Sequence, residues 1–171
     1  MGNMLGRYYF PIGQTPLPSN VKPHDFDPRE VAKQYRLAAE QGHVDAQASL
    51  ASLYWYGRGV REDFVGAARW YRRAADQGLS CAQLQLGEMY RDAKNGPKDY
   101  VQGHTWMNIA ASGESWSYCT QTAEKERDSI SLKMTPAQID EAHGLAREWL
   151  PNISRDPDGS TDIPKKREMI R

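Results

Sequence analysis

AQASLASLYWYGRGVREDFVGAARWYRRAADQG, residues 46–78, decides the fold of this chain. The stretch holds a helical segment, a turn with two glycines, and a second helical segment that ends at Gly78. The pattern returns when 36 is added to the residue numbers, and its second half returns when 36 is subtracted. The matched pairs are Ala46/Ala82, Leu50/Leu86, Tyr54/Tyr90, Asp63/Asp99, Trp70/Trp106 and Ala74/Ala110, and in the other direction Asp27/Asp63, Tyr35/Tyr71 and Gly42/Gly78. Self-similarity at a fixed period of about 20–50 residues indicates a solenoid.

The recurring residues follow A-x-x-x-L-(A/G)-x-x-Y, then G-x-G-V, then D-x-x-x-A-x-x-W-(Y/M)-x-x-A-A-x-x-G. This pattern resembles the Sel1-like repeat, a relative of the tetratricopeptide repeat, over residues 45–78 and 81–113, and over half a unit at 27–42. The resemblance implies an all-α solenoid of helix-turn-helix repeats, an αα superhelix of bacterial type. In the second unit Ala93-Lys94-Asn95-Gly96 replaces Gly57-Arg58-Gly59-Val60, which leaves the geometry of that turn open.

Local signals predict seven helices, near residues 28–41, 45–56, 64–77, 81–92, 100–112, 116–134 and 136–150. Asp27, Asp63 and Asp99 stand where helix N-caps belong, and such caps contribute about 1 kcal/mol each. The sequence Ser80-x-x-Gln83 predicts a capping box for the fourth helix. The last helix resembles the closing helix of bacterial family members, so a helical C-terminal cap is expected to end the stack.

Three regions are expected along the chain. Residues 1–26 form a Pro/Gly-rich N-terminal arm, residues 27–150 the repeat solenoid with its capping helices, and residues 151–171 a mobile C-terminal tail. The arm is rich in apolar side chains, so it either packs along the first helix as a cap or meets a partner. Within the solenoid, Trp70 and Trp106 are predicted to fill the space between layers and to be buried.

Composition limits the classes of partner. The chain has 22 Lys and Arg residues against 22 Asp and Glu, and a formal net charge of zero. Binding to nucleic acid needs a basic face, so a nucleic-acid partner is not expected. No run of 18 apolar residues exists, so no membrane span is predicted. Residues 1–13 do not read as an intact signal peptide; the compartment is periplasmic if a signal was removed and otherwise cytoplasmic. A monomer is expected.

The two cysteines, Cys81 and Cys119, form no C-x-x-C motif and no metal-binding spacing. Both are expected near the beginnings of adjacent helices, whose axes lie about 8–10 Å apart. A disulfide needs Cα atoms within about 7 Å. This comparison favours two free thiols over a bridge and leaves the redox compartment open.

No catalytic constellation stands out. The four histidines lie far from one another in the sequence and do not form H-E-x-x-H, so surface histidines are expected rather than metal ligands. The G-x-G at Gly57 and Gly59 lacks the rest of a phosphate loop and belongs to the repeat's turn. Neither a cofactor nor a metal is predicted.

The remaining candidate site is a surface. In the related tetratricopeptide geometry the first helix of each unit lines the concave side, and the resemblance implies the same here. The helix positions on that side that are not needed for core packing form the expected partner-binding set, which is Asp45, Ser52, Trp55, Tyr56, Leu84, Glu88, Arg91 and Asp92. Trp55 either points into the groove as an interface hot spot or folds against the N-terminal arm.

The resemblance implies a protein-protein interaction module without enzymatic activity. It would act as an adaptor or scaffold, in an envelope or signalling assembly, and bind its partner on the concave face of the repeats. One alternative is an immunity protein that binds and neutralises a secreted antibacterial effector, a role that small members of the family fill. An alternative of another class is an enzyme with an unrecognised active site in the groove, which the lack of any catalytic motif disfavours.

Overall fold

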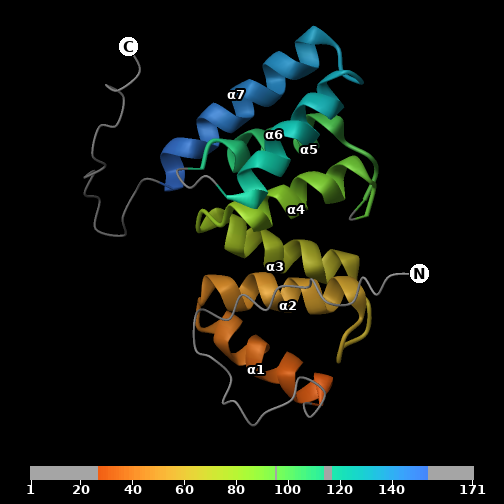
Figure 1. Cartoon of the computed structure of the whole chain (residues 1–171), viewed down its shortest axis with the longest axis vertical. Helices are drawn as coiled ribbons and strands as arrows, with labels where there is room; N and C mark the ends of the chain where they lie inside the picture. The colour runs from red at the N-terminus through yellow and green to blue at the C-terminus, as the bar shows by residue number, and fades with distance from the viewer. Residues whose placement is uncertain (1–26, 95, 114–116, 154–171) are drawn as a thin grey trace.

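The computed structural model describes residues 27–94, 96–113 and 117–153, and these form seven α-helices without any strand (Figure 1). The helices are α1 (Pro28–Glu40), α2 (Val44–Tyr56), α3 (Phe64–Asp76), α4 (Ser80–Arg91), α5 (Tyr100–Ala111), α6 (Tyr118–Ser131) and α7 (Pro136–Ile153). The expected all-α architecture is confirmed. The predicted arm, residues 1–26, and the predicted tail from residue 154 onward lie outside the described residues, and α7 continues past the predicted boundary at residue 150.

The helices stack in chain order from α1 to α7, as expected of a solenoid (Figure 1). Each helix from α1 to α5 packs on the helix that follows it, α4 packs also on α6, and α5 on α7. Helix pairs such as α2–α3 cannot bury their apolar faces alone, so the stacking makes the core.

The two equivalent tryptophans differ in burial. Trp106 of α5 is 3 % exposed, and Trp149 of α7 packs against it edge-to-face with ring centroids 5.3 Å apart. Trp70 of α3 is only half-buried, with the Arg73 guanidinium 4.5 Å from its ring centroid. The prediction that both rings are buried is therefore right for Trp106 and wrong for Trp70, because no described helix covers Trp70 as α7 covers Trp106.

Aspartate caps begin three helices as predicted. Asp27 accepts a hydrogen bond from the Arg29 backbone N–H, and Asp63 and Asp99 cap α3 and α5 in the same way. The predicted capping box at Ser80 is wrong, because the N-cap of α4 is Leu79 and Ser80 is already helical.

Gln83 serves instead to join two units. Its Nε2 atom donates to the Ala75 carbonyl oxygen at 3.1 Å, near the end of α3. The equivalent Gln47 donates to the Ala39 carbonyl oxygen at 3.2 Å, near the end of α1. Each buried amide therefore finds an acceptor in the preceding helix, and adds a second hydrogen bond to a carbonyl that also accepts from the Gly42 or Gly78 backbone N–H.

The turn that departs from the repeat pattern keeps the backbone conformation of its first position. Ala93 has a φ of 59°, against 63° for the equivalent Gly57, so an alanine adopts the left-handed conformation there. Gly59 is needed for a different reason, because a Cβ at this position would lie 2.0 Å from the Pro28 carbonyl oxygen at the start of α1. The turn of the first complete unit thus packs directly against the preceding half unit.

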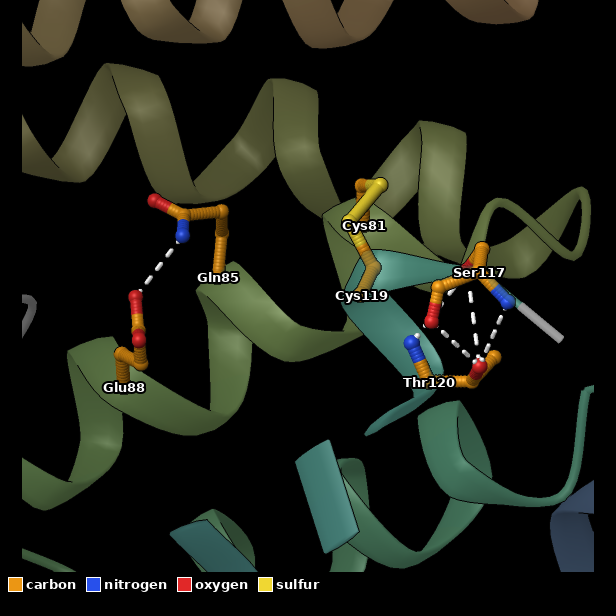
Figure 2. Close-up of a disulfide and its surroundings, with 6 residues drawn as sticks. All are labelled: Cys81, Gln85, Glu88, Ser117, Cys119 and Thr120. Carbon is orange, nitrogen blue, oxygen red and sulfur yellow. Dashed lines mark hydrogen bonds between the residues drawn. A yellow bond between two sulfur atoms is a disulfide. The ribbon is translucent and has the colours of Figure 1, made fainter. Parts of the chain in front are cut away.

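Cys81 and Cys119 form a disulfide, contrary to the prediction of free thiols (Figure 2). Their Cα atoms lie 5.0 Å apart, and each cysteine is the second residue of its helix, α4 or α6. The prediction compared axis separations, but two Cα atoms that face each other across packed helices are closer than the axes by two helix radii of about 2.3 Å each. The disulfide fixes the start of α6 on the start of α4.

Candidate interaction surface

The predicted partner-binding positions on α4 turn out to face α6. Leu84 is 4 % exposed and packs with Met107, Ala123 and Ile130. The disulfide lies at one end of this α4–α6 contact, and the ion pair of Arg91 with Glu126 lies toward the other. Leu84 is therefore a core residue and not available to a partner, because α6 lies over the stretch of α4 that was expected to be open.

Two predicted residues on α2 stand apart from the rest. Trp55 is half-buried and packs edge-to-face on Phe64, with ring centroids 5.0 Å apart, beside the core. Asp45 is exposed in the first turn of α2, about 16 Å along the helix axis from Tyr56. Trp55 therefore takes part in core packing, and Asp45 lies at the opposite end of α2 from Tyr56.

The other predicted residues converge with one residue that sequence reasoning missed. Arg91 forms ion pairs with Asp92, at 2.7 Å, and with Glu126 of α6. We name this group the acidic face, formed by Tyr56 of α2, by Glu88, Arg91 and Asp92 of α4, and by Glu126 of α6. Its own residues hold three carboxylates and one guanidinium, and Lys94 and Lys98 act electrostatically on Asp92 from its edge. Glu126 belongs to the charged run 124–128, but only the packing of α6 on α4 shows that it meets Arg91.

Hydrogen bonding and burial act differently on the charged groups of this face. The hydrogen bond from Arg91 holds the pKa of the Asp92 carboxyl below its usual value, and the same bond raises the pKa of Arg91. Burial raises the pKa of Glu88; Arg91 opposes this shift, while Glu126 and Asp92 reinforce it. Glu88 is thus the carboxylate whose negative charge is least well compensated.

Polar neighbours orient Glu88. The Gln85 Nε2 atom, one helical turn away on α4, donates to its carboxylate at 2.7 Å (Figure 2). The buried Tyr71 hydroxyl of α3 lies near both Glu88 and Tyr56 and hydrogen-bonds Ser52, and burial is the main cause of its raised pKa. Ser52 therefore acts on this region through Tyr71.

Tyr56 is 43 % exposed, and the Arg58 guanidinium lies 5.3 Å from its ring centroid. The carboxylates of the acidic face can bind a cation.

A second polar group lies between α5 and α7, where the structure brings together two histidines that are distant in sequence. The rings of His104 and His143 have centroids 5.2 Å apart. His104 is 1 % exposed, its Nε2 atom lies 3.1 Å from the Ser131 hydroxyl, and its Nδ1 atom has no hydrogen-bond partner among the described residues. The expectation of surface histidines is wrong for His104. Where the chain is described, no group of three or more metal-ligating side chains exists.

Acid is expected to destabilise the fold through His104. Burial, with His143 and Arg127 adding to it and Asp128 opposing it, lowers the pKa of His104 to about 4 in the folded state, below the unfolded value of about 6.5. The unfolded chain therefore binds the proton more readily, so the contribution of neutral His104 to stability is complete above about pH 6.5 and falls as the pH drops toward 4. Urea unfolding at pH 7 and pH 4.5 should show a loss of about 2 kcal/mol that His104→Gln removes. The matched variant His43→Gln, at an exposed position, should keep the loss. An equal loss in His104→Gln would contradict the prediction.

The chain is similar to a known family of repeat proteins. The model of the Sel1 repeat family matches residues 35–43, 44–79 and 82–115. No curated protein matches the chain. None of the described helices is long and apolar enough to cross a bilayer.

Two solved structures are similar to this chain. One is c5321, described as a protective antigen present in uropathogenic Escherichia coli strains and displaying an SLR fold; it is 31% identical, with a TM-score of 0.70. The match covers 75% of this chain and 27% of c5321. The other is a Sel1 repeat protein from Oxalobacter formigenes, 24% identical with a TM-score of 0.55, and the match covers 72% of this chain and 49% of that protein. The chain thus spans about a quarter of the first protein and about half of the second.

Proposed function

Because this chain is a Sel1-repeat protein, and Sel1 repeats are generally protein-protein interaction modules, we propose that it binds a partner protein through the acidic face on the concave side of the repeats. The partner presents a lysine or arginine side chain that reaches Glu88. No catalytic step is needed for this role.

The observation that carries the proposal is the state of Glu88. Its carboxylate is half-buried and its pKa is raised, while the nearby Arg91 is already paired with Asp92 and Glu126. A cation from a partner would offset the cost of burying this charge, and charge-assisted hydrogen bonds are stronger than neutral ones.

Glu88→Gln tests the proposal, since it removes the charge and keeps the shape. A tagged protein is used to capture partners from the native cells, and the affinity of the captured partner is then measured with purified proteins. Glu88→Gln is expected to weaken binding about tenfold or more, which corresponds to about 1.4 kcal/mol. The same variant should unfold at an unchanged or higher temperature, because a half-buried and only partly compensated charge is removed.

The matched control is Glu141→Gln on α7, where the side chain is exposed and outside the acidic face. It should bind like the wild type. Equal affinity in Glu88→Gln and the wild type would refute the role of the acidic face. A single stoichiometric partner that is a secreted antibacterial effector would identify the chain as an immunity protein, and several weaker partners would identify a scaffold.

A further inference from the structure

Two hollows lie one repeat apart on a different part of the surface. The first, of about 560 Å³, is lined by Arg36, Tyr54 and the turn residues Val60–Asp63. The second, of about 440 Å³, is lined by residues of α3 and α4 that include Arg72 and Tyr90. Subtracting 36 from Arg72 and Tyr90 gives Arg36 and Tyr54. An arginine and a tyrosine at equivalent repeat positions therefore line each hollow, while the rest of each lining differs.

The arginines of these hollows are held in place by aromatic side chains. Arg36 donates to the Tyr54 hydroxyl, with its guanidinium 5.7 Å from the Tyr54 ring centroid. The Arg72 guanidinium lies 4.7 Å from the Trp106 ring centroid, while half of the side chain remains exposed. Side chains fixed in this way lose little rotamer entropy when a ligand binds, and guanidinium groups favour carboxylates as planar partners.

The second hollow combines positive charge with an apolar lining. Arg69, Arg72 and Arg73 line it, and of these only Arg72 has a carboxylate partner within the described residues, Asp76 at 2.8 Å. Its apolar side includes Val65, which is 51 % exposed. Three guanidinium groups against one carboxylate leave an excess of positive charge beside exposed apolar surface.

We infer that these two hollows form a second binding site, for an acidic polypeptide segment in which aspartate or glutamate alternates with apolar side chains. One segment spans both hollows, its carboxylates on the arginines and its apolar side chains beside Val65. The first hollow sets Arg36 and Arg61 against Glu62 and Asp63, so the continuous phosphates of a nucleic acid would meet both signs of charge, whereas a peptide can place its carboxylates on the arginines alone. The site is separate from the acidic face, because its charged groups come from α1, α3 and the α2–α3 turn.

Fluorescence anisotropy with labelled probes tests the inference on the full chain. The probe is a short peptide that repeats Glu-Glu-Leu, and the comparison probes are a peptide that repeats Lys-Lys-Leu and a single-stranded oligothymidine. The acidic peptide is expected to bind, and Arg69→Glu should weaken it about tenfold. Arg36→Glu, in the other hollow, should weaken it further when combined with Arg69→Glu, because one peptide contacts both hollows.

Two matched variants separate this site from the rest of the surface. Arg147→Glu on α7 and Glu88→Gln on the acidic face should both bind the acidic peptide as the wild type does, and circular dichroism should show every variant folded. Unchanged affinity in folded Arg69→Glu would overturn the inference, and so would failure of the acidic peptide to bind. Tighter binding of the oligothymidine would also overturn it, and so would tighter binding of the lysine peptide that persists in Glu88→Gln. Binding of the lysine peptide that Glu88→Gln removes would report on the acidic face, and the results with the acidic peptide do not bear on binding at Glu88.

Discussion

Trp106→Ala is expected to lower the free energy of unfolding by about 3–5 kcal/mol, as large-to-small substitutions of buried aromatic residues do. The indole is 3 % exposed, so its removal leaves a cavity in the main core cluster. Two further contacts disappear with it, the edge-to-face contact with Trp149 and the contact with the Arg72 guanidinium. Since these residues belong to α7 and α3, the loss should weaken the packing of three helices. Urea unfolding followed by far-UV circular dichroism measures the effect.

Trp70→Ala is the matched control, because Trp70 occupies the same position one repeat earlier. Its indole is half-buried, so the loss should be smaller by at least about 1 kcal/mol. An equal loss in the two variants would show that the repeat position, rather than the cover provided by α7, sets the stability. Trp106→Phe should retain most of the packing and fall between Trp106→Ala and the wild type.

Removing the disulfide is expected to cost about 4 kcal/mol by the chain-entropy relation for a loop of this length. The bridge joins residues that are 38 positions apart, and it encloses α4 and α5 in a covalent loop. Without it the unfolded chain gains conformational freedom. The variant Cys81→Ala/Cys119→Ala avoids leaving a free thiol, and differential scanning calorimetry gives its stability.

The wild type under strong reductant is the control for this variant. Both should lose similar stability, and the denaturant dependence of the double variant should be steeper, since its unfolded state exposes more surface. A loss below about 1 kcal/mol in both samples would contradict the prediction. A loss in the double variant alone would point to side-chain packing at these positions rather than to the bridge.

Local rules predicted the repeats, the helices and the aspartate caps because each depends on a few neighbouring residues. The period identified the fold, and Asp27, Asp63 and Asp99 cap helices as expected. Ala93 shows the limit of such rules, since the repeat imposes the left-handed turn on a residue that does not favour it.

Apart from the capping box expected at Ser80, the errors concern contacts between helices. Leu84 was expected on an open face, and the disulfide was not expected, for the same reason. Both lie in the α4–α6 contact, and the repeat pattern degrades before α6, so the sequence did not show how closely α6 lies on α4. The meeting of Arg91 with Glu126, and of His104 with His143, depends on the same kind of packing and could not be predicted from spacing.

The bonds from Gln47 and Gln83 to the ends of the preceding helices have a consequence for how such a protein can change its length. The two joints are chemically identical, Gln47 to Ala39 and Gln83 to Ala75. A duplicated copy of residues 44–79 inserted between α3 and α4 would meet the Gln83 amide on one side and the Ala75 carbonyl on the other. The same insertion after α5 would separate Cys81 from Cys119. The structure is therefore compatible with an additional repeat between α3 and α4, whereas an additional repeat between α5 and α6 would break the disulfide.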